Sequence, residues 1–284
     1  MCVPLLSSQL PNLVNPSSPL RFKISKFFAS DIVDMEIGSG SFGKVFTSDS
    51  STKVVKMQEI DKHGLGVQPN IIREILVLQA MNHANIVKLL KVNPTQDRKY
   101  ICMVFEKADS NLYDFIRNPS SKYDPDSFIN QIKSGLAYIH ANRIIHRDLK
   151  TQNILVFGGD TVKLCDFGLS VPSYGRTNTP DMITLNYRPP EILLGVLQYG
   201  TEVDIWSLGC VIYEIRKKTL LVKIDSDAAI DALNFIMQGW KASPKEFCKP
   251  FPISNSFLTA KIDFSFDKFM HNCLAINPLK RPNL

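Results

Sequence analysis

Two short segments near the middle of the chain gather polar residues whose types and spacing suit phosphate chemistry. The first, IIHRDLKTQNIL, holds Asp148, Lys150 and Asn153, and the second, KLCDFGLS, brings Asp166 thirteen residues after Asn153. Transfer of a phosphoryl group from a nucleotide needs oxygen ligands for Mg²⁺, a carboxylate that orients the attacking hydroxyl, and a cation near the moving phosphate. We expect Asp148 to orient the hydroxyl and accept its proton, and Lys150 to lie near the γ-phosphate. Asn153 and Asp166 are the expected magnesium ligands.

A glycine cluster nearer the N-terminus, GSGSFGKV, has the pattern of a loop that approaches a phosphate closely. Its three glycines let the backbone present N–H groups to an anion without obstruction by side chains. A dinucleotide-binding loop shares this pattern, but it needs a helix that opens at the glycines and an acidic residue about 20 positions later. Here the sequence continues as a strand towards Lys56, which argues against that alternative. The residues assigned to the nucleotide-binding loop are Ile37, Gly38, Ser39, Gly40, Ser41, Phe42, Gly43, Lys44 and Val45.

Lys56 and Glu74 are the next candidates for this nucleotide site. Lys56 ends an apolar strand, where a lysine is costly unless it is paired, and Glu74 lies in a helix that is otherwise apolar on its inward face. Each residue alone would be interpreted as a surface residue. Together with the glycine loop, they predict a lysine that is held by a carboxylate and aimed at the phosphates.

The elements that must position these residues change in character along the chain. Residues 32–57 alternate apolar and polar types around glycines, which predicts antiparallel strands, and residues 99–108 form a further apolar strand. Apolar residues at helical spacing predict helices over 70–83, 128–142 and 203–217. A strand-rich first third with one main helix, followed by a helix-rich remainder, predicts an α+β protein with two lobes. The boundary between the two lobes is expected at 106–110. Residues 1–27, which are rich in Ser and Pro, are expected to form a flexible extension.

Composition narrows the class of protein further. Of the 284 residues, 44% are apolar and 21% are charged, which is typical of a globular protein with a sizeable core and excludes a disordered or collagen-like chain. No stretch approaches the roughly 18–20 apolar residues of a membrane helix. The net charge of +6 is scattered, so we expect no direct nucleic-acid binding. The six widely spaced cysteines contain no CxxC pair and favour a reducing interior over a zinc site or a disulfide framework.

The glycine loop, Lys56, HRDLKxxN and DFG occur in the order of the signature motifs of eukaryotic protein kinases, and the chain resembles that family from about residue 28 to residue 284. Later motifs also match: Glu191 stands where the family has Ala-Pro-Glu, Asp204 where it anchors its central helix, and Arg281 where an arginine pairs with that glutamate. The resemblance implies a bilobal kinase fold, with lobes over about 28–106 and 110–284, and ATP with Mg²⁺ as cofactors.

The same resemblance implies roles for residues that composition and spacing leave unassigned. Glu106 and Ala108 would offer backbone hydrogen bonds to adenine. The DLK form of the catalytic loop, together with Thr184 in the substrate-docking segment, implies transfer to serine or threonine of protein substrates. The chain stops three residues after Arg281, short of the final helix of a typical large lobe, which leaves a minimal kinase and a truncated sequence both open.

Within the family the chain resembles the cyclin-dependent kinases. QPNIIREI aligns with their cyclin-binding helix and matches it at Ile72, Arg73 and Glu74. The resemblance implies a cyclin or other regulatory subunit, activating phosphorylation at Thr179, proline after the phosphoacceptor through Arg188, and a role in cell-cycle or transcription control in the nucleus or cytoplasm. Two alternatives stay open, namely a related proline-directed kinase that needs no cyclin and a pseudokinase that acts as a scaffold.

Overall fold

The structure is a computed structural model that describes residues 33–40, 43–48, 52–60, 66–95, 97–119, 122–173, 183–224, 228–239 and 267–284. The predicted extension over 1–27, the loop residues Ser41 and Phe42, and the predicted phosphorylation site Thr179 lie outside these residues. The chain divides into two compact units, one made of Met1–Ile71 and Lys88–Lys107 and the other of Ile72–Val87 and Ala108–Leu284.

The first unit is built on a five-stranded sheet in the order β1-β2-β3-β5-β4, in which every neighbouring pair is antiparallel. The strands are β1 (Val33–Gly40), β2 (Gly43–Ser48), β3 (Lys53–Glu59), β4 (Leu89–Pro94) and β5 (Tyr100–Glu106). One face is closed by a small core of Phe46, Val55, Cys102 and Val104. The strands expected around the glycines and over 99–108 are therefore confirmed, whereas β4 was not predicted.

The predicted helix over 70–83 is α1 (Pro69–Ala80), and the division between the units falls inside it. The segment after α1 belongs to the second unit because its backbone pairs with strand β9 (Thr161–Leu164) of that unit: Val87 N donates to Leu164 O at 3.0 Å and Leu164 N donates to Asn85 O at 2.9 Å. Residue 135, in the helix over 125–141, must be glycine for this segment to lie so close, since a Cβ on Gly135 would be 2.8 Å from Asn85 O. The predicted first lobe, about 28–106, includes this segment, which groups with the second unit by its contacts, and the lobe limits stay a prediction.

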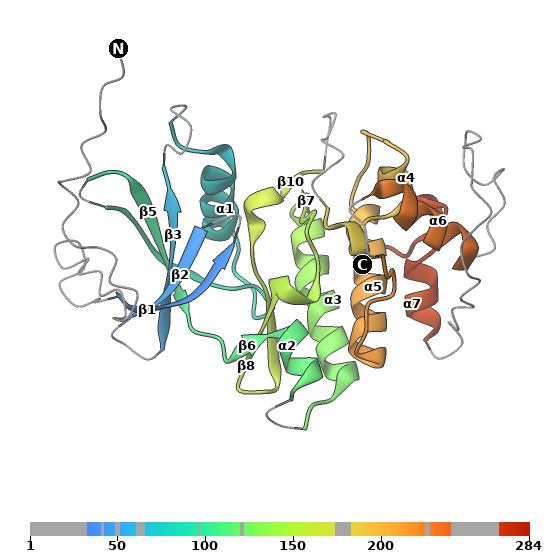
Figure 1. The fold of residues 1–284 in the computed structure, drawn as a ribbon, viewed down its shortest axis with the longest axis horizontal. Helices are drawn as coiled ribbons and strands as arrows, with labels where there is room; N and C mark the ends of the chain where they lie inside the picture. The colour runs from blue at the N-terminus through green and yellow to red at the C-terminus, as the bar shows by residue number, and fades with distance from the viewer. Residues whose placement is uncertain are drawn as a thin grey trace, which may run out of the picture. The chain divides into compact units, whose positions relative to one another are not determined.

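The second unit is mostly helical and is organised around α5 (Glu202–Lys217), of which twelve of sixteen residues are buried. A helix that is apolar on nearly all sides is stable only in the centre of a larger core. Helices α3 (Pro125–Ala141) and α7 (Lys268–Cys273) pack against α5, and the three run side by side (Figure 1). The remaining helices are α2 (Leu112–Arg117), α4 (Pro190–Leu193) and α6 (Ala229–Gly239). The predicted helices over 128–142 and 203–217 are confirmed as parts of α3 and α5.

Short strands in the second unit were not predicted. They form a three-stranded sheet, β6-β8-β9, and a two-stranded sheet, β10-β7. Their bounds are β6 (Ser110–Asn111), β7 (Ile144–Ile145), β8 (Ile154–Phe157) and β10 (Val171–Pro172). These strands have two to four residues, too few for an alternation of apolar and polar residues to be recognised in the sequence. They hold the loops between β7 and β10 in place. No helix among the described residues has the length and apolar character needed to cross a membrane.

Candidate active site

The loop after β7 carries the first cluster of predicted residues, and a buried carboxylate at the start of α5 holds its backbone. Asp204 is fully buried, and its two oxygens accept hydrogen bonds from His146 N at 2.8 Å and Arg147 N at 2.9 Å. His140 Nε2 lies 2.9 Å from the same carboxylate. Burial alone would raise the pKa of Asp204, but the hydrogen bond and charge of His140 and the charge of His146 outweigh it and hold this pKa below its usual value. Asp204 therefore fixes the loop to α5 through both of its oxygens.

Four of the predicted residues meet around the Asp148 carboxylate, which is 3% exposed. Asn153 Nδ2 donates to Asp148 Oδ2 at 2.7 Å, and Thr184 Oγ1 donates to Asp148 Oδ1 at 2.6 Å. Lys150 Nζ lies 2.8 Å from Asp148 Oδ2 and donates to Thr184 Oγ1 at 2.8 Å. The three predicted catalytic residues thus contact one another. One of the two predicted metal ligands joins them.

The second predicted metal ligand, Asp166, follows a residue that is tied to the same loop. Cys165 N donates to Asn153 O at 3.0 Å, and Cys165 O lies 3.0 Å from His146 Nε2. Asp166 itself has φ 63° and ψ 72°, a left-handed conformation that is uncommon for a residue with a side chain. The next residue, Phe167, is buried with its ring centroid 4.9 Å from that of His146. These contacts hold the backbone of Asp166 next to Asn153 in a strained conformation.

The Asn153 side chain is held by its amide nitrogen. Its Nδ2 donates both to Asp148 Oδ2 and to Asp148 O, at 2.7 and 2.9 Å, so both amide protons are used. Its carbonyl oxygen Oδ1 accepts no hydrogen bond from any residue that the structure describes. An amide oxygen is a ligand type that suits a hard cation such as Mg²⁺, and the role of Asn153 as a metal ligand stays a prediction.

The glycine loop belongs to the first unit, where β1 and β2 pair as a hairpin with Gly40 opposite Gly43. Gly43 has φ 120°, and a Cβ there would lie 2.3 Å from Met57 O, so no other residue fits without a shift of the backbone. Of the predicted loop residues, Ile37, Gly38, Ser39 and Gly40 lie on β1, whereas Gly43, Lys44 and Val45 lie on β2. Lys44 Nζ forms an exposed ion pair with Glu36 at 3.1 Å.

The other predicted nucleotide contacts are divided between the units. Lys56 lies on β3, opposite Val45 of β2, and Glu106 ends β5. Glu74 is buried on α1, in the part of that helix that belongs to the second unit. Ala108 also belongs to the second unit. An ion pair between Lys56 and Glu74 would join the two units and stays a prediction.

Sequence reasoning did not assign a role to three polar residues of the second unit, of which Thr151 lies in the loop itself. Thr151, Tyr187 and Glu214 share hydrogen bonds behind the Asp148 cluster. The sequence contained one usable signal, because Glu214 interrupts the apolar residues of a helix that is buried on nearly all sides. A carboxylate in that environment needs donors from elsewhere in the fold.

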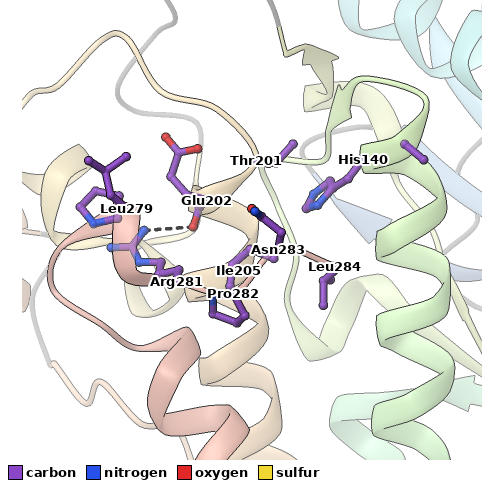
Figure 2. A pocket seen from close by; sticks show the side chains of 11 residues that line it. His140, Thr201, Glu202, Ile205, Leu279, Arg281, Pro282, Asn283 and Leu284 are labelled. Carbon is purple, nitrogen blue, oxygen red and sulfur yellow. Dashed lines mark hydrogen bonds between the residues drawn. The ribbon is translucent and has the colours of Figure 1, made fainter.

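A hollow of about 430 Å³ in the second unit lies away from these residues, between the end of α3, the start of α5 and the last residues of the chain. His140, Glu202, Arg281 and Leu284 are among the residues that line it, and Figure 2 shows Arg281 donating to the Glu202 carbonyl. None of the predicted site residues contributes to this hollow.

The sequence of the chain is similar to those of known proteins. The model of the protein kinase domain matches residues 32–284. Among curated proteins, "Cyclin-dependent kinase 2" of Caenorhabditis elegans is 41% identical over 193 residues, which are 63% of this chain and 51% of that protein. "CTD kinase subunit alpha" of Saccharomyces cerevisiae is 36% identical over 195 residues, which are 66% of this chain and 37% of that protein. The matched part of this chain therefore spans about half of the first relative and less of the second.

Proposed function

The chain belongs to the protein kinase family, and on this basis we propose that it transfers the γ-phosphate of ATP to serine and threonine hydroxyls of protein substrates. The observation that supports this most directly is the hydroxyl of Thr184, held between a carboxylate and an ammonium group, 2.6 Å from Asp148 Oδ1 and 2.8 Å from Lys150 Nζ. A carboxylate that accepts one aliphatic hydroxyl in this geometry is suited to accept another from a substrate.

In this mechanism Asp148 orients the acceptor hydroxyl and takes its proton as the oxygen attacks. Asn153 holds the carboxylate through Oδ2, which leaves Oδ1 facing Thr184 and the acceptor. Lys150 places a positive charge beside the same oxygens, where it stabilises negative charge that develops on the phosphoryl group in the transition state. Rate enhancement then comes from positioning and charge, because phosphoryl transfer leaves little covalent chemistry for the protein to perform.

The residues present fit ATP with Mg²⁺. When bound, the metal would neutralise phosphate charge, and the uncommitted Oδ1 of Asn153 together with the carboxylate of Asp166 would hold it. The glycines of the β1–β2 hairpin would cover the phosphates with backbone N–H groups, and Lys56, paired with Glu74, would bind them from β3. Glu106 and Ala108 would contact adenine through their backbones.

The test is transfer of labelled γ-phosphate from Mg-ATP to Ser-Pro, Thr-Pro and Tyr-Pro peptides, with the purified protein alone and with a panel of purified cyclins. Transfer to serine and threonine only supports the proposal, and transfer to tyrosine contradicts its specificity. Equal transfer with and without every cyclin would favour the cyclin-independent kinase. A folded protein that binds ATP but transfers to nothing would favour the scaffold.

A preference for proline after the phosphoacceptor has support in the segment around Thr184. Arg188 Nε donates to Ile183 O at 2.8 Å, which engages the carbonyl just before Thr184. A substrate whose next residue has an N–H would find this acceptor occupied, and an unsatisfied buried N–H costs about 1–3 kcal/mol. Proline has no N–H and avoids that cost.

We therefore expect Arg188→Ala to reduce the preference for Ser-Pro over Ser-Ala peptides by about tenfold, mainly by improving transfer to Ser-Ala. The ratio of kcat/KM for the two peptides measures this effect. Lys223→Ala, which removes an exposed cation of the same unit, serves as the control and should leave the ratio unchanged. A variant at Arg188 that slows both peptides equally would refute this origin of the preference.

Activating phosphorylation at Thr179 has support in two arginines of the second unit. Arg73 Nη1 donates to Gly168 O at 2.7 Å and Arg147 Nε donates to Leu169 O at 2.6 Å, so both contact backbone of the DFG segment. Burial and the nearby charge of Arg147 lower the pKa of Arg73. Two neighbouring guanidinium groups would be stabilised by a shared dianion, and a phosphate on Thr179 would supply one.

A cyclin partner has support in the outer face of α1. Ile72 and Leu76 are 46% and 61% exposed, and they lie four residues apart, so they share one face of the helix. The buried residues Ile71, Glu74 and Leu78 occupy the opposite face. In the cyclin-dependent kinases, which this chain resembles, the corresponding helix binds the cyclin, so we assign this apolar face to it.

Leu76→Glu should therefore lower cyclin-stimulated transfer by at least about tenfold, because a charge would enter an apolar interface. Transfer without cyclin should stay within about twofold. Leu279→Glu is the matched control, since Leu279 is 93% exposed on a different surface. Stimulation that survives Leu76→Glu would mean that the activator binds elsewhere.

A further inference from the structure

A buried carboxylate on α5 connects the catalytic loop to the segment that carries Thr184. Glu214 has no exposed surface, and it accepts three hydrogen bonds from residues far away in the sequence. Thr151 Oγ1 donates to Glu214 Oε2 at 2.9 Å, and the Tyr187 hydroxyl donates to the same oxygen at 2.6 Å. Arg117 Nη2 donates to Glu214 Oε1 at 2.9 Å. The hydroxyls of Thr151 and Tyr187 are 3.2 Å apart.

Arg117 compensates the buried carboxylate of Glu214. It is the cationic partner of Glu214, and its guanidinium also lies 3.6 Å from the ring centroid of Tyr113 and donates to Tyr113 O at 3.0 Å. A buried carboxylate with a cation and two hydroxyl donors is well compensated, whereas loss of one donor leaves it undersatisfied. Burial and the charge of Glu214 raise the pKa of Tyr187, so its hydroxyl remains a donor.

The two hydroxyl donors stand next to the reacting groups. Thr151 directly follows Lys150, and Tyr187 lies at the end of the short 3₁₀ helix (Leu185–Tyr187) that begins just after Thr184. The backbone of Tyr187 is fixed to α5 as well, because Ser207 Oγ donates to Tyr187 O at 3.0 Å. Lys150 and Thr184 themselves are joined by one direct hydrogen bond, at 2.8 Å, and both also contact Asp148. A displacement of either segment would therefore separate Lys150 from Thr184.

We propose that Thr151 and Tyr187 are positioning residues for phosphoryl transfer, and that Glu214 couples them. Through this carboxylate the loop with Asp148 and Lys150 and the segment with Thr184 share one anchor on the most buried helix of the unit. The proposal rests on the proposed function, since it names residues that hold its reacting groups in place. It requires that removal of one hydroxyl change how much removal of the other lowers the rate of phosphoryl transfer.

The test uses Thr151→Val, Tyr187→Phe and the double variant, which remove hydroxyls and keep side-chain shape. Each single variant should lower kcat about tenfold while KM for the peptide and for ATP stays within about twofold, because misplacement of reacting groups acts on the transition state. The double variant should lose far less than the product of the two, as expected for residues that act through one carboxylate. Thr151→Ser, which keeps the hydroxyl, should restore most of the rate.

Thr161→Val is the matched control, because the Thr161 hydroxyl donates only to exposed Asp160 in the turn before β9. The proposal is overturned if Thr151→Val keeps the full rate, if the two losses multiply, or if Thr151→Ser is as slow as Thr151→Val.

Amide hydrogen exchange on the same proteins decides the coupling independently of activity. Thr151→Val should raise exchange both in residues 146–153 and in residues 183–190, and Tyr187→Phe should do the same. Exchange that rises only around the substituted residue would overturn the coupling. A wild-type protein that transfers no phosphate under any condition would refute the proposed function, and the exchange result would still decide whether Glu214 couples the two segments.

Discussion

Asp148→Asn is expected to lower kcat for phosphoryl transfer by about a thousandfold, within the range of 10²–10⁴ that is typical of a general base. The substitution keeps the size of the side chain and removes its charge. It also replaces one carboxylate oxygen, which accepts hydrogen bonds, with an amide nitrogen, which donates them. Thr184 Oγ1 and Asn153 Nδ2 both donate to the carboxylate of the wild type, at 2.6 and 2.7 Å. The amide of the variant can no longer accept hydrogen bonds at both positions, one of which Lys150 Nζ also contacts at 2.8 Å, and it has no site for the proton of the substrate hydroxyl.

The measurement is transfer of labelled phosphate to a Ser-Pro peptide at saturating ATP, with the affinity for ATP determined separately. Asp160→Asn is the matched control, because Asp160 is an exposed aspartate in the turn before β9; its activity should equal that of the wild type. The melting temperature of both variants separates lost chemistry from lost folding. If Asp148→Asn keeps more than about a third of the wild-type rate, Asp148 is not the base, and a scaffold function becomes the better explanation of any cellular activity.

Arg281→Met is expected to reduce the free energy of unfolding by about 3–5 kcal/mol, because it leaves the Glu191 carboxylate buried without a cation. The Arg281 side chain has no exposed surface and binds both oxygens of Glu191, with Nη2 at 2.8 Å from Oε2. Its Nε donates to Ala275 O at 2.9 Å, and its Nη1 donates to Glu202 O at 3.0 Å. One guanidinium thus joins α4, the start of α5 and the end of the chain.

Urea unfolding of the full chain measures this loss. Lys280→Met, a change of the adjacent exposed cation, should alter the stability by no more than about 0.5 kcal/mol. A second variant, Arg281→Met with Glu191→Met, should recover part of the loss because no unpaired charge remains in the core. A loss below about 1 kcal/mol in the single variant would mean that water reaches Glu191 and that the pair does not stabilise the fold.

The contacts that these two variants test differ in how far the sequence suggested them. Asn153 follows Asp148 by five residues, but the sequence indicated separate roles for the two, and their contact at 2.7 Å comes from the structure. Arg281 and Glu191 are 90 residues apart, and only the resemblance to the kinase family paired them. The structure confirms that pair, and the family match confirms the kinase fold.

Contacts that neither spacing nor resemblance suggested occur where buried helices meet loops. Glu214 binds Arg117 and Thr151 at sequence separations of 97 and 63 residues. In the sequence, Glu214 interrupts the apolar residues of its helix, but nothing there indicates which residues it binds. Its role follows only from the packing of α5, because burial on all sides obliges its carboxylate to find donors.

The sequence by itself indicated the protein kinase family and several of the regular elements, namely β1, β2, β3, β5, α1, α3 and α5. The types and spacing of Asp148, Lys150, Asn153 and Asp166 predict phosphate chemistry, and helical periodicity predicts α3 and α5, because both signals are local. The tertiary structure alone decided that Asp204 holds the catalytic loop, that the segment after α1 joins the second unit, and that Thr151 and Tyr187 share Glu214. These contacts depend on which polar groups folding removes from water, and that depends on the packing of the whole unit rather than on neighbouring residues.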